Sequence, residues 1–185
     1  MSHPRLLDRD QSVLVVIDVQ EAYRGLTVEP ERMMRGIRRL IEAAKIVGVP
    51  ILATEQYPKG LGHSMPEVAQ AFPDGLEVIE KRSLSCCGES RFVSRLAALS
   101  RRQVVVCGLE AHACVNQTTH DLLDRGYQVH LPFDALGARF EPDYRMAWEK
   151  MIGSGAVPST VEMICLEWVR TAESPDFKAI QKLIK

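Results

Sequence analysis

Three residues of this sequence are of types that cooperate in nucleophilic chemistry: Asp18, Lys81 and Cys114. Asp18 and Lys81 each follow a short strand pattern, and Cys114 comes after the apolar run at 104–106 and a turn. Cys114 also opens a helical pattern. The free N–H groups and the macrodipole at the start of a helix stabilise a thiolate and can hold a developing oxyanion. Cys114 is therefore a candidate nucleophile, and a cation such as Lys81 beside it would depress the thiol pKa.

Each of these residues also has a structural interpretation. A free cysteine is most often a small buried hydrophobe, and structural burial of Cys114 is the more frequent outcome of this local pattern. Asp18 could equally cap the turn that follows its strand, and a lysine just past a strand is usually solvated. Chemistry therefore requires a fold that brings the three side chains together.

Strand and helix patterns alternate along the chain. Strands are predicted at 13–17, 50–54, 77–80, 104–106, 128–132 and 156–158. Helices are predicted at 30–47, 90–100, 114–125 and 142–152, with further helices starting near 160 and 174. Such alternation implies right-handed βαβ units and an α/β fold: a three-layer, doubly wound domain with a mainly parallel six-stranded sheet. A strand order of 3-2-1-4-5-6 would bring the first and fourth strand ends together, where ligands collect in such sheets.

Local signals mark several boundaries. Gly48 and Gly126 stand where the first and third predicted helices end. The S-x-x-E spacing of Ser159 and Glu162 predicts a capping box that opens a helix. The loop at 55–63 is rich in glycine and proline and suits a substrate rim over the sheet edge. A plain surface connection is the more frequent role for any one residue of that loop, His63 included.

Length and charge favour a small-molecule function. The 185 residues, 46% hydrophobic and 25% charged, suit one domain over residues 1–185. A formal net charge of −1 gives no general reason to bind nucleic acid or an anionic membrane. Neither G-x-G-x-x-G nor a P-loop is present, so nothing indicates a dinucleotide or a nucleoside triphosphate. We expect a small-molecule substrate, with no nucleic-acid or membrane partner.

The N-terminus and the cysteines indicate a compartment. Residues 1–12 are polar, and no stretch approaches the roughly 20 continuous apolar residues of a membrane span. The five cysteines are an odd number, lack C-x-x-C spacing and include the adjacent pair Cys86-Cys87. We therefore expect a reduced, cytoplasmic location.

Several spaced motifs resemble the isochorismatase-like cysteine hydrolase family, in particular its isochorismatase domain-containing members. In chain order they are VIDVQ with Asp18 and Gln20, TEQYPKGLG at 54–62, EKRSLS with Lys81, CGLEAHACVNQTT with Cys114, SGAVPSTVE at 154–162 and the FKAIQKLIK tail. The resemblance covers nearly the whole chain. It implies the isochorismatase-like fold and a hydrolytic activity.

The resemblance also implies roles for residues of the site. Asp18, Lys81 and Cys114 would form a catalytic triad, and the N–H groups of Glu110 and Cys114 an oxyanion hole. A cis peptide bond between Leu109 and Glu110 would aim the Glu110 N–H into that hole. Candidates for the substrate pocket are Gln20, Tyr23, Glu55, Tyr57 and Leu84.

The implied reaction is cleavage of a small amide or other C–N bond through a thioester. Asp18 would take the thiol proton and pass it to the leaving amine, after which an activated water would release the acid. We expect no metal and no cofactor, because His63 stands without the Asp-x-His spacing of the relatives that hydrolyse nicotinamide. Vinyl ether cleavage is disfavoured because true isochorismatases lack a nucleophilic residue at the position of Cys114.

Two other functions compete with hydrolysis. The chain could be a non-catalytic binding or scaffold protein that retains the fold, although a scaffold needs neither Asp18 nor Lys81. It could also be a thiol redox sensor that pairs Cys114 with Cys86 or Cys87, although their spacing is not diagnostic. We further expect a homo-oligomer; its candidate contact residues are Met146, Trp148, Met151, Ile164 and Trp168, which could instead fill the core of one subunit.

Overall fold

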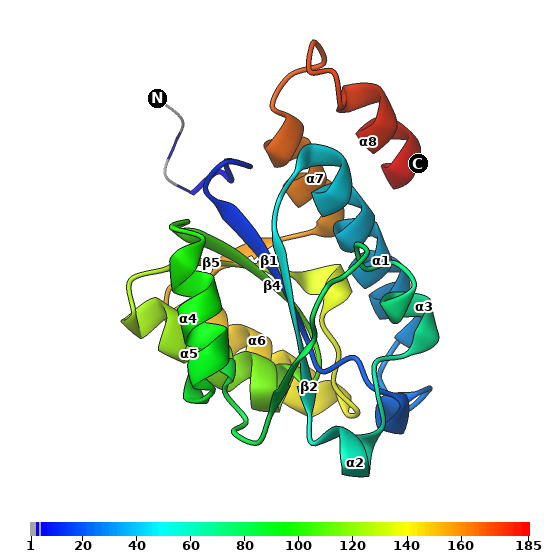
Figure 1. The fold of residues 1–185 in the computed structure, drawn as a ribbon, viewed down its shortest axis with the longest axis vertical. Coiled ribbons are helices and arrows are strands. Elements are labelled where there is room, and N and C mark those ends of the chain that lie inside the picture. Colours follow the sequence, from blue (N-terminus) through cyan, green and yellow to red (C-terminus); the bar gives the residue numbers. More distant parts are fainter. Residues whose placement is uncertain (1–2, 4) are drawn as a thin grey trace.

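Six strands form one parallel sheet in the computed structural model of the protein (Figure 1). The strand order is β3-β2-β1-β4-β5-β6, and every neighbouring pair is parallel. The bounds are Ser12–Ile17 for β1, Ile51–Gln56 for β2, Ile79–Lys81 for β3, Gln103–Gly108 for β4, Gln128–Pro132 for β5 and Val157–Ser159 for β6. The structure describes residues 3 and 5–185. The predicted strand order is confirmed.

Helices cover both faces of this sheet. Their bounds are Pro30–Val47 for α1, Pro58–Leu61 for α2, Pro66–Ala69 for α3, Ser90–Ala98 for α4, Asn116–Asp124 for α5, Glu141–Gly153 for α6, Val161–Val169 for α7 and Phe177–Ile184 for α8. Helices α1, α7 and α8 pack on one face, and α4, α5 and α6 pack on the other (Figure 1). The three-layer architecture expected from the alternation of elements is therefore confirmed.

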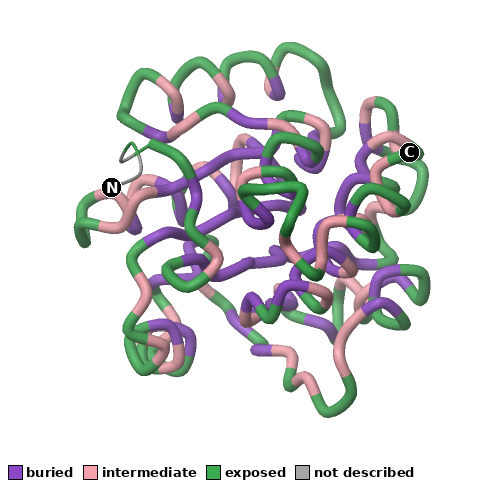
Figure 2. The backbone as a smooth tube through the Cα atoms, turned by 90° about the horizontal axis from the view of Figure 1, so that it is seen from above, coloured by how far each residue is buried: buried purple, intermediate pink, exposed green. Residues whose placement is uncertain are grey.

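Strand β1 shows why the central strands are apolar throughout. Leu14 and Val16 point into the layer that holds α1, whereas Val13, Val15 and Ile17 point into the layer that holds α4 to α6. Every residue of β1 is buried, and the buried strands run through the centre of the molecule in Figure 2. A strand covered on both faces must be apolar at every position, which explains the continuous run.

Residues 30–47 carry apolar side chains at helical spacing, and helix α1 buries most of this stripe. The buried members are Met33, Ile37, Leu40, Ile41, Ala44 and Val47. Each large aliphatic side chain contributes about 1.5–3 kcal/mol by leaving water. Gly48 ends the helix in the left-handed conformation, with a φ of 75°.

Two element boundaries differ from the sequence prediction near the sheet edge. Strand β2 continues through Glu55 and Gln56, which pair in register with Glu80 and Lys81 of β3. Their polar side chains end the apolar pattern but not the strand. A helical turn over Ala111–Val115 precedes α5, so the helix does not begin at Cys114. This turn is a π-helix, and its extra residue breaks the 3.6-residue period by which helices are recognised.

Smaller differences occur in two connections. The loop predicted at 55–63 contains α2, and α3 follows soon after it; both are single turns that start at a proline, too short to show a period. Helix α7 is capped by Thr160, whose hydroxyl accepts from the Met163 N–H, and not by Ser159. Ser159 remains in β6, paired with Pro132, so the cap falls one residue later than the S-x-x-E spacing suggests.

The candidate subunit contacts are mostly internal, which corrects that prediction. Met151 and Ile164 are 0% exposed and Trp168 is 2% exposed, so they fill the core of this chain. Trp148 is half-buried, and its ring meets Phe133 edge-on. Of the five candidates, Met146 alone is exposed. The reason is that α6 and α7 face the sheet with the same apolar side chains that suggested an interface.

No helix in the described part of the chain is long and apolar enough to cross a bilayer. Residues 1, 2 and 4, part of the N-terminal stretch in which we expect no apolar leader, lie outside the described residues.

Candidate active site

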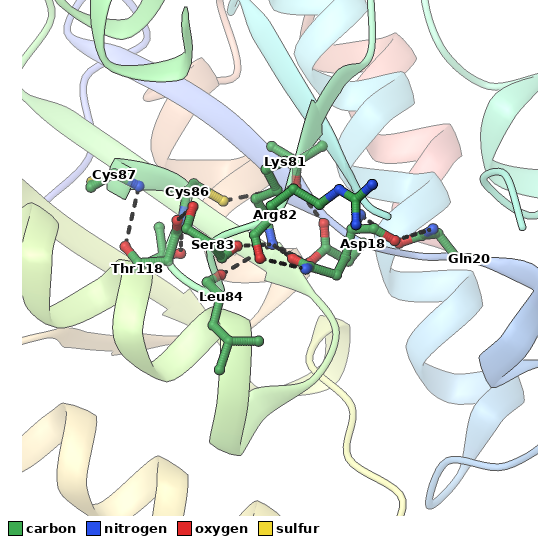
Figure 3. A network of polar contacts seen from close by, with 12 residues as sticks. Asp18, Gln20, Lys81, Arg82, Ser83, Leu84, Cys86, Cys87 and Thr118 are labelled. Atoms are coloured by element: carbon green, nitrogen blue, oxygen red, sulfur yellow. Dashed lines mark hydrogen bonds and ion pairs between the residues drawn. The ribbon is translucent and has the colours of Figure 1, made fainter. Parts of the chain in front are cut away.

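Asp18 and Lys81 form a buried ion pair at the C-terminal edge of the sheet (Figure 3). The Lys81 Nζ lies 2.7 Å from the Asp18 Oδ2, and the two side chains are 0% and 2% exposed. Asp18 follows β1 and Lys81 ends β3, so the lysine side chain reaches across the end of β2. Asp18 has a φ of 50°, a left-handed conformation that aspartate tolerates better than most residues.

Further hydrogen bonds fix both members of the pair. The Lys81 ammonium also donates to the Gln56 Oε1 at 2.7 Å and to the carbonyl oxygens of Ser83 and Leu84 at 3.2 and 3.1 Å. The Thr54 hydroxyl donates to the Asp18 Oδ1 at 2.7 Å. Each carboxylate oxygen thus accepts one hydrogen bond and keeps a lone pair for another donor.

Cys114 lies beside this pair, on the π turn that precedes α5. The Val115 N–H donates to the Glu110 carbonyl oxygen at 3.2 Å, the five-residue bond that defines this turn. Cys114 is 6% exposed, and its thiol interacts with both the Asp18 carboxylate and the Lys81 ammonium. The fold therefore brings together the three residues that the sequence singled out.

The charge state of the thiol differs from the sequence expectation. Burial raises the pKa of Cys114 to about 12; the Asp18 carboxylate also raises it, and Lys81 opposes both effects. The sequence predicted that Lys81 and the helix N-terminus would lower the pKa of Cys114. Their effect is outweighed, because burial disfavours the thiolate anion and a carboxylate shares the site. The thiol is therefore protonated at neutral pH, and the Asp18 carboxylate lies next to it.

The ammonium group of Lys81 stays charged. Burial alone would lower the pKa of Lys81, but the Asp18 carboxylate, Cys86 and Cys114 raise it above its ordinary value. A fixed positive charge beside the sulfur would favour the thiolate once the proton has left.

The segment before Cys114 has an unusual backbone. Gly108 approaches β1 so closely that an added Cβ would lie 2.1 Å from the Ile17 carbonyl oxygen. The peptide bond between Leu109 and Glu110 is cis. The Glu110 N–H donates no hydrogen bond to any of the described residues. The Glu110 carboxylate is buried and accepts from the Arg139 Nε at 2.7 Å.

Two of the five pocket candidates use their polar groups inside the protein. The Gln20 Nε2 donates to the carbonyl oxygens of Gln56 and Gly62, and its Oε1 accepts from the Gln56 N–H. The Glu55 carboxylate accepts from the N–H and the hydroxyl of Ser64 and bonds to the His63 ring. Both residues hold the loop after β2 in place.

The other three candidates lie around the edge of the site. Burial raises the pKa of Tyr23, and the charges of Glu110, Cys114 and Asp18 act in the same direction. Tyr57 is exposed, with the Arg82 guanidinium 3.9 Å above its ring. Leu84 is 46% exposed, and in Figure 3 its side chain points away from the polar network.

Sequence reasoning missed Thr54, Gln56 and Arg139. Thr54 and Gln56 are two residues apart at the end of β2 and contact Asp18 and Lys81. Alternate polar residues at the end of a buried strand are a signal that could have found them, because alternate side chains share one face. Nothing in the sequence connects Arg139 to Glu110, since the two are far apart along the chain.

The family model of the isochorismatase domain matches residues 12–163. The chain belongs to the isochorismatase family. Human isochorismatase domain-containing protein 2 is 40% identical over 176 residues, which cover 94% of this chain and 83% of that protein. Membership of the isochorismatase family supports a hydrolase-like function. The resemblance found in the sequence motifs is thereby confirmed.

Solved structures of the same fold agree with this assignment. A protein from Caenorhabditis elegans titled MAR1 ribonuclease has a TM-score of 0.92 and 36% identity, covering 97% of this chain and 92% of that one. YcaC from Escherichia coli, described as an octameric hydrolase of unknown specificity, has a TM-score of 0.89 and 22% identity, covering 99% and 92%. At that identity YcaC shows the isochorismatase-family fold alone. Among the described residues, no group of three or more His, Cys, Asp or Glu is placed to hold a metal ion.

Proposed function

We propose that the protein is a cysteine hydrolase that cleaves a small amide or related C–N bond through a thioester. One observation carries this proposal: a buried Asp18–Lys81 pair acts on the thiol of Cys114 at the sheet edge where ligands bind in this fold class. A scaffold would gain nothing from two buried charges, whose desolvation costs several kcal/mol per ion.

The first step uses Asp18 as the general base. As the Cys114 Sγ attacks the carbonyl carbon, its proton passes to Asp18, and the carbonyl π electrons move to the oxygen. Because the pKa of the thiol is raised to about 12, proton transfer accompanies the attack and no thiolate stands ready beforehand. Lys81 offsets the negative charge that develops on the sulfur.

The oxyanion is assigned to two backbone N–H groups, those of Glu110 and Cys114. The Glu110 N–H has no acceptor within the described residues, which supports this role. A preorganised donor aimed at a developing oxyanion lowers the activation barrier by about 2.7–4 kcal/mol in a well-studied protease. Arg139 fixes the Glu110 side chain through its 2.7 Å bond and so restrains the residue that supplies this N–H.

Collapse of the tetrahedral intermediate breaks the C–N bond. Asp18 gives its proton to the leaving nitrogen, and the acyl group remains on the Cys114 sulfur as a thioester. Asp18 then takes a proton from a water that attacks the thioester carbonyl, and the second collapse returns a proton to the sulfur. The products are a carboxylic acid and an amine or ammonia, and each step uses only protein groups and water.

The pocket and the assembly are part of the proposal. Tyr23 and Leu84 would line the substrate pocket, whereas Gln20 and Glu55 would hold the loop after β2 in its conformation. Tyr57, exposed beside Arg82, would border the entrance. We also propose a homo-oligomer; the octameric YcaC supports it, and Met146, Met163 and Leu166 are exposed apolar residues suited to contacts.

Intact-mass spectrometry tests the reaction. The protein is quenched in acid during turnover of a panel of primary amides, ureides and hydroxamates; at least one compound should add its acyl mass. Cys114→Ala should abolish both the adduct and turnover. Cys87→Ala is the matched control, because Cys87 is also buried and its thiol has no part in the mechanism.

The same panel includes a short single-stranded RNA, because one similar structure is titled a ribonuclease. Cleavage of RNA by the wild type and by Cys114→Ala alike, with no acyl adduct from any amide, would contradict the proposed function.

A further inference from the structure

A cleft of about 550 Å³ lies over the outer side of α1, and Tyr23, a candidate for the substrate pocket, is among its lining residues. Its walls are the segment before α1, helix α3 and the end of α8. Figure 1 shows α3 and α8 beside α1, with the sheet on the far side of that helix. Its volume is in the range of sites that hold small molecules.

The floor of the cleft is apolar. Met33 and Met65 are nearly fully buried, and Met34 and Leu183 are half-buried beside them. Methionine side chains adapt to ligands of irregular shape, because they are unbranched and polarizable. The apolar part of a ligand bound here would be buried against an apolar surface that is already formed.

The rim of the cleft carries cationic groups without partners. Arg35, Arg38 and Arg39 line it, and none of the three forms an ion pair or hydrogen bond with another described residue. By contrast, Arg24 at one end of the cleft binds Glu67 and Glu21.

The carboxylates of the lining do not neutralise these arginines. Glu67 is bound to Arg24, and Glu42 is bound to Lys45. Glu31 is exposed in the first turn of α1 and forms no ion pair with a described residue. Arg38 is close enough to Glu67 to help lower the pKa of that carboxyl group, but Arg35, Arg38 and Arg39 form no ion pair with a carboxylate of the lining. The excess of cationic groups favours an anionic ligand.

We propose that this cleft binds a small molecule with one acidic head group, carboxylate or phosphate, and an apolar body. The arginines hold the head group, and the methionine floor covers the apolar body. The cleft shares Tyr23 with the proposed substrate pocket, whereas Cys114 itself packs in the layer on the other face of the sheet.

Calorimetric titration at low salt tests the proposal with four probes: octanoate, octyl phosphate, 1-octanol and inorganic phosphate. Octanoate or octyl phosphate should bind saturably with a Kd below about 1 mM, an affinity within the ceiling known for ligands of this size. 1-Octanol and inorganic phosphate should each bind at least about tenfold more weakly, because each has only half of the recognised chemistry. The relative affinity of the two acids identifies the preferred head group.

Two variants connect the binding to named groups. Arg35→Met/Arg38→Met should weaken the tighter acid by about tenfold or more, whereas Arg145→Met, an exposed arginine on α6, should not.

Several results would overturn the proposal. The first is that neither acid binds saturably. The second is that 1-octanol binds as tightly as the acids. The third is that the tighter acid has the same affinity for Arg35→Met/Arg38→Met as for Arg145→Met. Loss of binding after carboxymethylation of Cys114 would place the ligand in the reaction centre. Dissociation of an oligomer by Arg35→Met/Arg38→Met, with no acid bound, would make the cleft a subunit contact.

Discussion

The charge neighbours of Cys114 predict how its reactivity depends on pH. Burial and Asp18 raise the pKa of the thiol to about 12, and Lys81 lowers it. Iodoacetamide alkylation of Cys114, followed by peptide mass, should therefore rise only above the roughly 8.5 of an ordinary thiol. Asp18→Asn should move the profile to lower pH, because a negative neighbour is lost. Lys81→Met should move it to higher pH.

The folded state of these two variants must be checked before their profiles are compared. Removing one partner of a buried ion pair leaves the other uncompensated and costs about 3–5 kcal/mol. Circular dichroism in the assay buffer separates unfolding from a change of pKa. A wild-type profile with a midpoint below about 8 would contradict the geometry described for the thiol.

Thr54 offers a test of how Asp18 is oriented. Thr54→Val keeps the shape of the side chain but removes the 2.7 Å hydrogen bond to the Asp18 Oδ1. We expect kcat on an active substrate to fall about tenfold with little change in KM, because the base loses its orientation while substrate binding is unaffected.

The matched control for Thr54→Val is Thr119→Val. Thr119 is also fully buried, but its hydroxyl has no partner within the described residues, so the substitution removes no hydrogen bond. Its activity should equal that of the wild type. Equal losses in the two variants would mean that threonine burial, and not the bond to Asp18, explains the effect.

The junction between β1 and β4 is the element that positions both Asp18 and Cys114. Gly108 has a φ of +114°, and an added Cβ would lie 2.1 Å from the Ile17 carbonyl oxygen. Gly108→Ala should therefore lower the free energy of unfolding by about 3 kcal/mol or more, because backbone atoms of a central strand cannot move aside cheaply. Urea denaturation measures the loss.

Gly153→Ala is the control for that substitution. An added Cβ at Gly153 meets nothing within 4 Å, and the residue ends α6. Alanine there should be neutral or stabilise by up to about 1 kcal/mol. If both glycines tolerate alanine equally, the close approach of β4 to β1 is not what requires glycine at position 108.

Helices and strands with a regular hydrophobic pattern could be predicted from the sequence. The segments next to the candidate active site were harder to predict. The apolar runs of β1 and β4 and the stripe of α1 are the direct result of burial on two faces or on one. The end of β2 is hidden because Glu55 and Gln56 are polar, and the π turn at Ala111–Val115 is hidden because no period marks it. These irregular segments are the ones next to the candidate catalytic residues.

At the scale of the whole molecule, the sequence gives positions along the strands but not the environment of a side chain. Asp18, Lys81 and Cys114 could be placed at one edge from strand order alone. The raised pKa of Cys114 could not, because it depends on burial and on the distance to a carboxylate. For the same reason, Met151, Ile164 and Trp168 suggested a subunit contact although they lie in the core.

His130 in the centre of β5 connects the stability of the molecule to pH. It is 1% exposed, its Nε2 bonds to no described group, and burial lowers the pKa to about 4. The unfolded chain binds a proton at His130 near pH 6.5, whereas the folded chain does not until about pH 4. Between these values the unfolded state holds more protons, so stability falls as pH falls through the window.

The expected loss from His130 between pH 7 and pH 5 is about 2 kcal/mol, by the linkage between proton binding and folding. Urea denaturation at the two pH values measures it in the wild type and in His130→Leu, which has a similar volume and no titrating group. The variant should lose about 2 kcal/mol less than the wild type over this interval, whatever its stability at pH 7. Because carboxylates titrate in both proteins, only the difference between the two slopes reports on His130. Equal slopes would mean that the imidazole is hydrated or bonded in solution, and that the centre of β5 is less closed than the structure shows.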